Sequence, residues 1–210
     1  SLPAASDEFS TAYGNIPLPR PVTPYTVLRT RGVCVDLTIS AQLDRLLDLG
    51  LADLAGTGRS ELADAAARLP DAPGAVLVVH PTLVSPGRLV PLLRRGDRPG
   101  FVVADLVDLD DFVPIDGVEV PDAPLYVVRD VDRGDDLRNW SPDEALPEIV
   151  GRGSTPLTVS EGVSWLLQEP ERLEPNHCFM TIASRKRKAR GLDTRTQAIW
   201  ISGGTGRDGK

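Results

Sequence analysis

Apolar residues recur at helical spacing near the start of the chain, where leucines return every three or four positions. This pattern predicts a helix over residues 38–50, with Thr38 or Ser40 as the N-cap and a glycine as the stop. The stretch SELADAAARLP predicts a second helix over residues 60–70, capped by Ser60 and ended by proline. The first third of the chain is therefore expected to be helical.

Short, continuous apolar runs rich in valine follow. The run GAVLVVH at 74–80 predicts a strand buried on both faces, and further strands are expected at 101–106 and 123–131. A helix between them, at 85–95, is shortened or kinked by an internal proline. Only residues 75–106 have the spacing of a strand–helix–strand crossover, which joins parallel strands.

Two later helix starts carry a complete capping signature. Ser141 with Glu144, and Thr158 with Glu161, place a hydroxyl at the cap and a carboxylate three residues on. Each pair can satisfy two backbone amides of the first turn reciprocally. Helices beginning at these two points are therefore expected.

The order of elements predicts an α/β to α+β fold, in which helices pack on a mixed β-sheet. The chain closes with a C-terminal β-hairpin of strands at 177–184 and 196–202. Residues 27–205 are expected to form a single globular domain. Residues 1–26 form a proline-rich arm that drapes over the domain or over a partner subunit, and 206–210 form a flexible tail.

Charge restricts the classes of partner. The net charge is −7, which argues against general affinity for nucleic acid or anionic membranes. Residues 183–210 nevertheless hold eight Lys/Arg against two Asp, or +6, so the rest of the chain carries −13. Two cysteines, no signal sequence and no apolar run near ~20 residues together predict a cytoplasmic, soluble protein without a membrane span.

The positive charge is concentrated in the hairpin connection at 185–195. The candidate interaction residues there are Arg185, Lys186, Arg187, Lys188 and Arg190. Such a segment can grip nucleic-acid phosphates, although it lacks the aromatic residues that stack on bases. It can equally form a solvated tip, or dock on an acidic face of a partner or of the same chain.

Acidic residues follow the predicted strands. Asp105, Asp130 and Asp132, together with His80, would line a pocket at the carboxyl ends of the central strands. Clustered carboxylates are ligands for a divalent metal, the one cofactor considered. The alternative is solvated turns, and the spacing does not match an EF-hand loop.

Two other chemical patterns are incomplete. His80, His177, Cys34 and Cys178 could supply a zinc site or a cysteine nucleophile only through neighbours in space, and buried thiols are the alternative. The final GTGRDGK fits most of a phosphate-binding loop, but Lys210 is not followed by the required hydroxyl or helix. A glycine-rich tail is the simpler interpretation.

The phrases DVDRG, PLTVSEGVSWLL, NHCF with a later SR, and AIWIS resemble a family of actinobacterial proteins that share a domain of unknown function. The similarity extends over about residues 75–205 and is strongest after residue 124. It implies a single-domain cytoplasmic bacterial protein and supplies no reaction or ligand.

Two functions remain open at this point. The absence of an organised chemical motif favours a non-catalytic binding or interaction protein. The alternative is an enzyme or a small-ligand domain with its pocket at the strand ends, and nucleic-acid contact through 185–195 is a minor third possibility.

Overall fold

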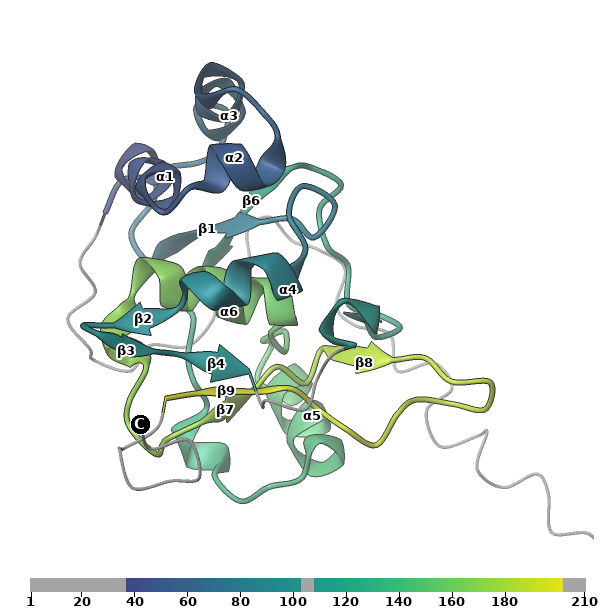
Figure 1. Cartoon of the computed structure of the whole chain (residues 1–210). Coiled ribbons are helices and arrows are strands. Elements are labelled where there is room, and N and C mark those ends of the chain that lie inside the picture. The colour runs from purple at the N-terminus through teal and green to yellow at the C-terminus, as the bar shows by residue number, and fades with distance from the viewer. Residues whose placement is uncertain (1–36, 103–107, 202–210) are drawn as a thin grey trace, which may run out of the picture.

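The computed structural model describes residues 37–102 and 108–201, which form an α+β fold (Figure 1). In these residues the strands pair only as antiparallel neighbours, in four small sheets rather than one mixed sheet. The predicted fold class is confirmed. The expected arm at 1–26 and tail at 206–210 lie outside the described residues.

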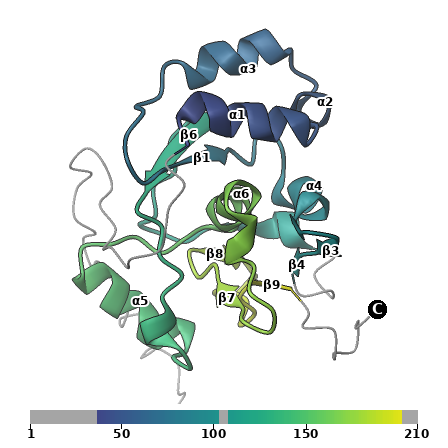
Figure 2. The same cartoon turned by 90° about the vertical axis from the view of Figure 1, so that its left-hand side faces the viewer.

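A two-stranded ribbon occupies the centre of the molecule. Strand β1 (Ala75–Val79) pairs antiparallel with β6 (Leu125–Arg129), and every residue of β1 is buried. Helices α1 (Ile39–Asp48), α2 (Leu51–Ala55) and α3 (Arg59–Ala66) lie on one side of it. Helix α6 (Val159–Gln168) lies on the other side (Figure 2). The ribbon therefore forms the middle layer of a helix–strand–helix stack.

The predicted crossover between residues 75 and 106 is wrong. Strand β4 (Phe101–Val102) pairs with the late strand β9 (Ala198–Trp200) and not with β1, whose neighbour is β6. The helix between β1 and β4 is a single turn, α4 (Pro86–Leu89). It is short because Pro91 follows two residues later, in η1.

The remaining elements build the lower half of the molecule. The strands are β2 (Arg94–Arg95), β3 (Arg98–Pro99), β5 (Phe112–Pro114), β7 (Phe179–Met180) and β8 (Ser184–Lys186). The helices are α5 (Pro142–Gly151) and the 3-10 turns η1 (Val90–Leu92), η2 (Leu109–Asp111), η3 (Asp135–Leu137) and η4 (Pro170–Arg172). Strand β9 lies between β4 and β7, so the predicted terminal hairpin is confirmed.

Helix starts follow the local sequence. Both capping boxes, Ser141 with Glu144 and Thr158 with Glu161, are formed as predicted. Thr38 caps α1, accepting from the third residue of the turn. The predicted cap at Ser60 is wrong, because α3 begins at Arg59 and its N-cap is Gly58, two residues before Ser60.

The free edge of β1 is closed by helix side chains. Gln42 of α1 accepts from the Leu77 amide (2.7 Å) and donates to the Ala75 carbonyl (2.7 Å), so its amide acts as a short additional strand. Ser164 of α6 accepts from the Val79 amide (3.1 Å). A buried, unpaired backbone group is costly, and these contacts fix both helices to the ribbon.

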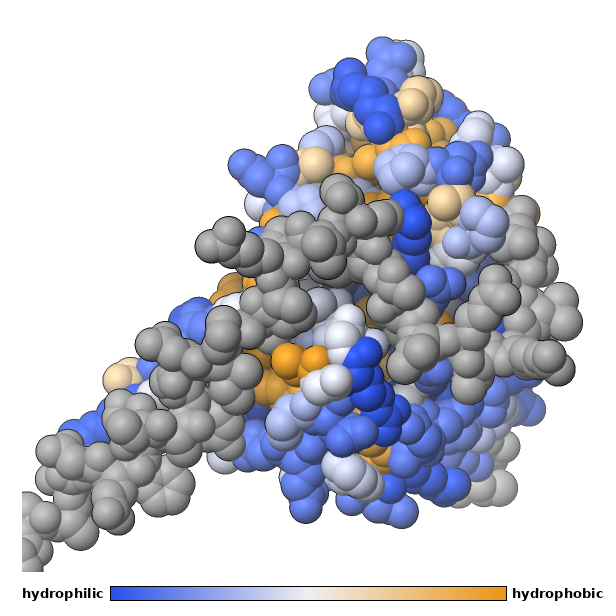
Figure 3. Space-filling view, turned by 180° about the vertical axis from the view of Figure 1, so that it is seen from behind, coloured by the Kyte–Doolittle hydropathy of each residue, from blue (hydrophilic) through white to orange (hydrophobic). Residues whose placement is uncertain are grey.

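The surface seen from behind is mostly polar, with apolar areas showing between charged residues (Figure 3). Within the described ranges, the helices are too short and too polar to cross a bilayer.

Candidate functional site

His80 and Asp130 lie at opposite ends of the β1–β6 ribbon. Each follows the carboxyl end of its own strand, and the two strands are antiparallel. The His80 amide donates to Pro124 (3.0 Å), whereas the Asp130 amide donates to Gly74 (2.9 Å). Five paired residues lie between the two positions, which are therefore roughly 20 Å apart along the ribbon. The expected pocket assumed parallel strands, and antiparallel pairing places the two residues apart.

His80 takes part in a local turn. Its Nδ1 accepts from the Thr82 amide (3.2 Å) and lies 2.6 Å from the Thr82 hydroxyl. Desolvation lowers the pKa of His80, and the nearby Asp122 opposes this shift. The contacts are those of a neutral imidazole that orders the turn after β1.

The acidic candidates also act in turns. Asp132 accepts from the Gly134 amide (2.7 Å), and Asp105 lies outside the described residues. Across residues 37–102 and 108–201, no three His, Cys, Asp or Glu side chains are grouped so that they could hold a metal ion. Cys178 is a free, exposed thiol, and Cys34 lies outside these ranges.

The basic segment forms a hairpin of its own, residues 184–195, here called the basic hairpin. Strand β8 pairs with β5 on one side and with the returning chain on the other, where Arg187 lies opposite Leu192. The Lys188 amide donates to the Gly191 carbonyl (3.0 Å), and Gly191 has a φ of 74°. A glycine in this left-handed conformation is typical of a tight hairpin turn. Figure 1 shows the hairpin reaching away from the body of the molecule, at the right.

One face of the basic hairpin is an ion-pair network, here called the paired face. Lys186 bonds Asp108 (2.9 Å) and Asp111 (2.7 Å), and Arg195 bonds Asp108 (2.7 Å) and Asp193 (3.0 Å). Lys188 also reaches Asp193 (3.1 Å). The cations of this face are therefore neutralised by carboxylates of the same chain.

The network alters the acidity of its members. Hydrogen bonds from Arg195, and then from Lys186, lower the pKa of Asp108 to about 2. The Arg195 side chain and backbone lower the pKa of Asp193, whose side chain is only 3% exposed. Arg195 also stacks over the Phe112 ring, 5.7 Å from its centroid. These contacts hold the hairpin rigidly against η2 and β5.

The opposite face, here called the outer face, carries Val113, Arg185, Arg187 and Leu192. Strand register places all four on one side, because cross-strand neighbours share a face. Val113 is 40% exposed and Leu192 is 42% exposed. Among the residues that the structure describes, Arg187 forms an ion pair with Asp116 alone (2.7 Å), whose side chain is 91% exposed. On the outer face, Arg185 and Arg187 therefore lie in the middle, with exposed Val113 on one side of them and exposed Leu192 on the other.

A second polar cluster joins the phrases DVDRG and NHCF. Arg133 bonds Asp135 (2.8 Å) and Glu174 (3.1 Å), and the His177 ring lies against both carboxylates (3.4 and 3.1 Å). Arg133 lowers the pKa of Asp135, and His177 lowers that of Glu174. The four side chains close a ring that clamps the loop after β6 to the loop before β7.

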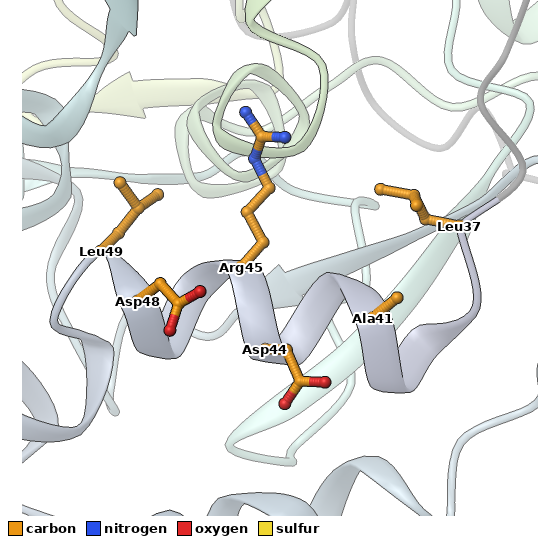
Figure 4. Close-up of a pocket in the computed structure, with 6 residues that line it drawn as sticks. All are labelled: Leu37, Ala41, Asp44, Arg45, Asp48 and Leu49. Carbon is orange, nitrogen blue, oxygen red and sulfur yellow. The ribbon is translucent and has the colours of Figure 1, made fainter.

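A hollow of about 450 Å³ runs along α1. Figure 4 shows Leu37, Ala41, Arg45 and Leu49 pointing to the same side of the helix. The Arg45 guanidinium donates to the Leu167 carbonyl near the C-terminus of α6 (2.7 Å), where a cation is favoured by the helix dipole. The arginine therefore ties two helices together.

The sequence located the basic hairpin but not its two faces. Val113 lies some 70 positions before the strand it pairs with, and no local signal connects them. The sequence does indicate that the four basic residues at 185–188 divide between two faces, because successive residues of a strand point to opposite sides.

Neither the curated proteins nor the solved structures include a match to this chain. A protein-family model does match, from residue 45 to residue 210, which is most of the chain. The resemblance to a domain of unknown function is confirmed by this match, and the chain belongs to that family of unknown function, DUF5701.

Proposed function

We propose that this protein is a non-catalytic interaction protein that binds a partner protein on the outer face of its basic hairpin. One observation carries the proposal: two exposed apolar side chains, Val113 and Leu192, share a face with Arg185 and Arg187. Exposed apolar side chains interspersed with arginine are typical of protein interfaces.

Rigidity supports the same conclusion. The paired face fixes the hairpin through Lys186, Lys188 and Arg195, so the outer face is already formed before a partner arrives. Binding to a formed surface avoids much of the entropic cost of ordering it. The partner expected here offers an apolar contact with neighbouring carboxylates, which would replace the exposed Asp116 opposite Arg187.

The same geometry disfavours nucleic acid as the partner. Four of the hairpin cations, Lys186, Arg187, Lys188 and Arg195, already bond carboxylates of this chain, and phosphate binding would have to displace those contacts. Affinity for nucleic acid depends on free cations that release counterions.

The test is selection from a displayed peptide library with the immobilised full chain. We expect enrichment of peptides in which an apolar residue adjoins Asp or Glu. The double variant Val113→Ser, Leu192→Ser should bind these peptides about tenfold more weakly, as loss of two apolar contacts implies. The matched control is Met180→Ser, which removes another side chain that is 47% exposed, on β7.

Equal binding by the double variant and the control would contradict the proposal. So would tight binding of a mixed-sequence RNA or DNA oligonucleotide that is lost in the double variant. Thermal unfolding of each variant checks that the hairpin remains folded.

We further propose that residues 27–205 form one domain of a cytoplasmic actinobacterial protein. The two cysteines and the phrases shared with actinobacterial proteins support this. Limited proteolysis that leaves a stable fragment of this span would agree with it, and cleavage within the span would contradict it.

A further inference from the structure

The hollow along α1 has the chemistry that the outer face requires of a partner. Its apolar lining consists of Leu37, Ala41 and Leu49, which are all half-buried. Asp44 and Asp48 line the hollow as well, and both are exposed. Within residues 37–102 and 108–201, neither carboxylate forms an ion pair or a hydrogen bond. The same chain therefore carries an apolar face that contains arginines and an apolar hollow that contains unpaired carboxylates.

We propose that the outer face of one molecule docks in the α1 hollow of a second copy of this chain. The inference rests on the proposed function, because it names the partner of the same surface. Val113 and Leu192, which are 40% and 42% exposed, contact Leu37 and Leu49 of the second copy. The contact therefore covers exposed apolar side chains on one molecule and half-buried ones on the other.

The charges of the two surfaces match in sign and in spacing. Asp44 and Asp48 lie one helical turn apart, so their side chains stand roughly 6 Å from each other. Arg185 and Arg187 lie two residues apart on one face of β8, at roughly 7 Å. Arg187 is 55% exposed and its partner Asp116 is 91% exposed, so exchanging this carboxylate for one of the second copy costs little.

Two further cations are already held within their own molecule. Arg185 donates to the Asp193 carbonyl (2.7 Å), a neutral group that leaves its positive charge available to a carboxylate. Arg45, the one cation among the residues lining the hollow, donates to the Leu167 carbonyl (2.7 Å). Figure 4 shows its guanidinium pointing toward α6 and away from Asp44. The hollow therefore keeps a net negative charge where the arginines of the outer face enter.

The two surfaces lie at opposite ends of the molecule. Figure 1 shows α1 at the upper left and the basic hairpin at the lower right, so one molecule cannot join its own two surfaces. The contact is therefore head-to-tail, and its repetition builds an open chain or a closed ring. Charge favours this orientation, because residues 183–210 carry +6 and the rest of the chain carries −13.

Analytical ultracentrifugation of the full chain tests the contact. A small, partly polar contact binds weakly, so the average mass should rise between roughly 10 μM and 1 mM. The hollow variant Asp44→Lys, Asp48→Lys should stay monomeric over the same range. The matched control is Glu61→Lys, Asp64→Lys, which makes the same change of charge at exposed positions of α3 and should associate like the wild type.

Mixing two defective variants gives the sharper test. The outer-face variant Val113→Ser, Leu192→Ser should also be monomeric alone, because it keeps the hollow and lacks the face. The hollow variant keeps the face and lacks the hollow. An equimolar mixture should therefore form a one-to-one dimer and nothing larger. Thermal unfolding of each variant confirms that it is folded.

A mixture that stays monomeric would overturn the inference. So would self-association that survives in either variant, or a wild-type chain that is monomeric at the highest concentration. Binding of displayed peptides through Val113 and Leu192 without self-association would overturn the head-to-tail contact and leave the proposed function standing. The absence of both peptide binding and self-association would overturn the two together.

Discussion

Replacing Gln42 with leucine should destabilise the protein strongly, although the side chain changes little in size. Gln42 is 3% exposed. Its side-chain amide accepts from the Leu77 N–H and donates to the carbonyls of Ala75 and Leu37. Gln42→Leu would leave the Leu77 N–H and the Ala75 C=O buried without partners. Each such group costs about 1–3 kcal/mol.

The added apolar surface of leucine offsets roughly 1–2 kcal/mol of that loss. The free energy of unfolding should therefore fall by about 2–4 kcal/mol. Urea unfolding followed by far-UV circular dichroism measures this change, with an unaltered m-value showing that the denatured state is comparable.

Gln168→Leu is the matched control. Gln168 is also buried, at 5% exposure, but within residues 37–102 and 108–201 its side chain makes one hydrogen bond, from Nε2 to the Gln42 backbone carbonyl (3.1 Å). The side-chain oxygen of Gln168, Oε1, is buried and has no hydrogen-bond partner in the described part of the chain. The substitution removes one bond and one unpaired acceptor, so a loss below about 1 kcal/mol is expected. Equal losses for the two variants would refute the edge-closing role of Gln42.

Three further changes have defined outcomes. Gly162→Ala should cost about 1–3 kcal/mol in urea unfolding, because the added carbon would lie 2.7 Å from Thr181, whereas Gly151→Ala meets nothing and should be neutral or stabilising. Asp108→Asn should destabilise at pH 7, and because the folded pKa is lowered to about 2, the difference from wild type should vanish as pH falls from about 4 to about 2. Burial raises the pKa of Glu161, so stability of the wild type should rise as pH falls from neutral toward 4.5, and Glu161→Gln should lack this trend in thermal melts. A wild-type melting profile identical to that of Glu161→Gln across this range would contradict the buried-carboxylate argument.

Local signals predicted the local structure well. The capping boxes at Ser141 and Thr158 need only residues within one turn, so the sequence located both helix starts. The apolar run of β1 likewise predicted a strand buried on both faces. Each of these elements depends on neighbours a few positions away.

Pairing between distant segments was not predictable in the same way. An apolar run does not say which strand it joins, and the partner of β1 proved to be β6 rather than β4. That choice separated His80 from Asp130. The partners of Lys186 lie more than 70 positions earlier, so its charge alone could not show that it is neutralised.

The sequence did not mark α2 as a separate helix. Its five residues continue the leucine pattern of α1 beyond Gly50. Gly50 ends one helix in a left-handed conformation and starts the next (φ 94°). The glycine was predicted to end the helix, and in the structure it also begins a second helix, α2.

The most direct measurement of the docking surface is methyl NMR of the full chain during titration with a peptide selected as above. The outer-face account predicts that the Val113 and Leu192 methyl signals shift together with one saturation curve, while the Met180 methyl signal stays in place. Unmoved Val113 and Leu192 signals at saturating peptide, with shifts elsewhere on the surface, would contradict it.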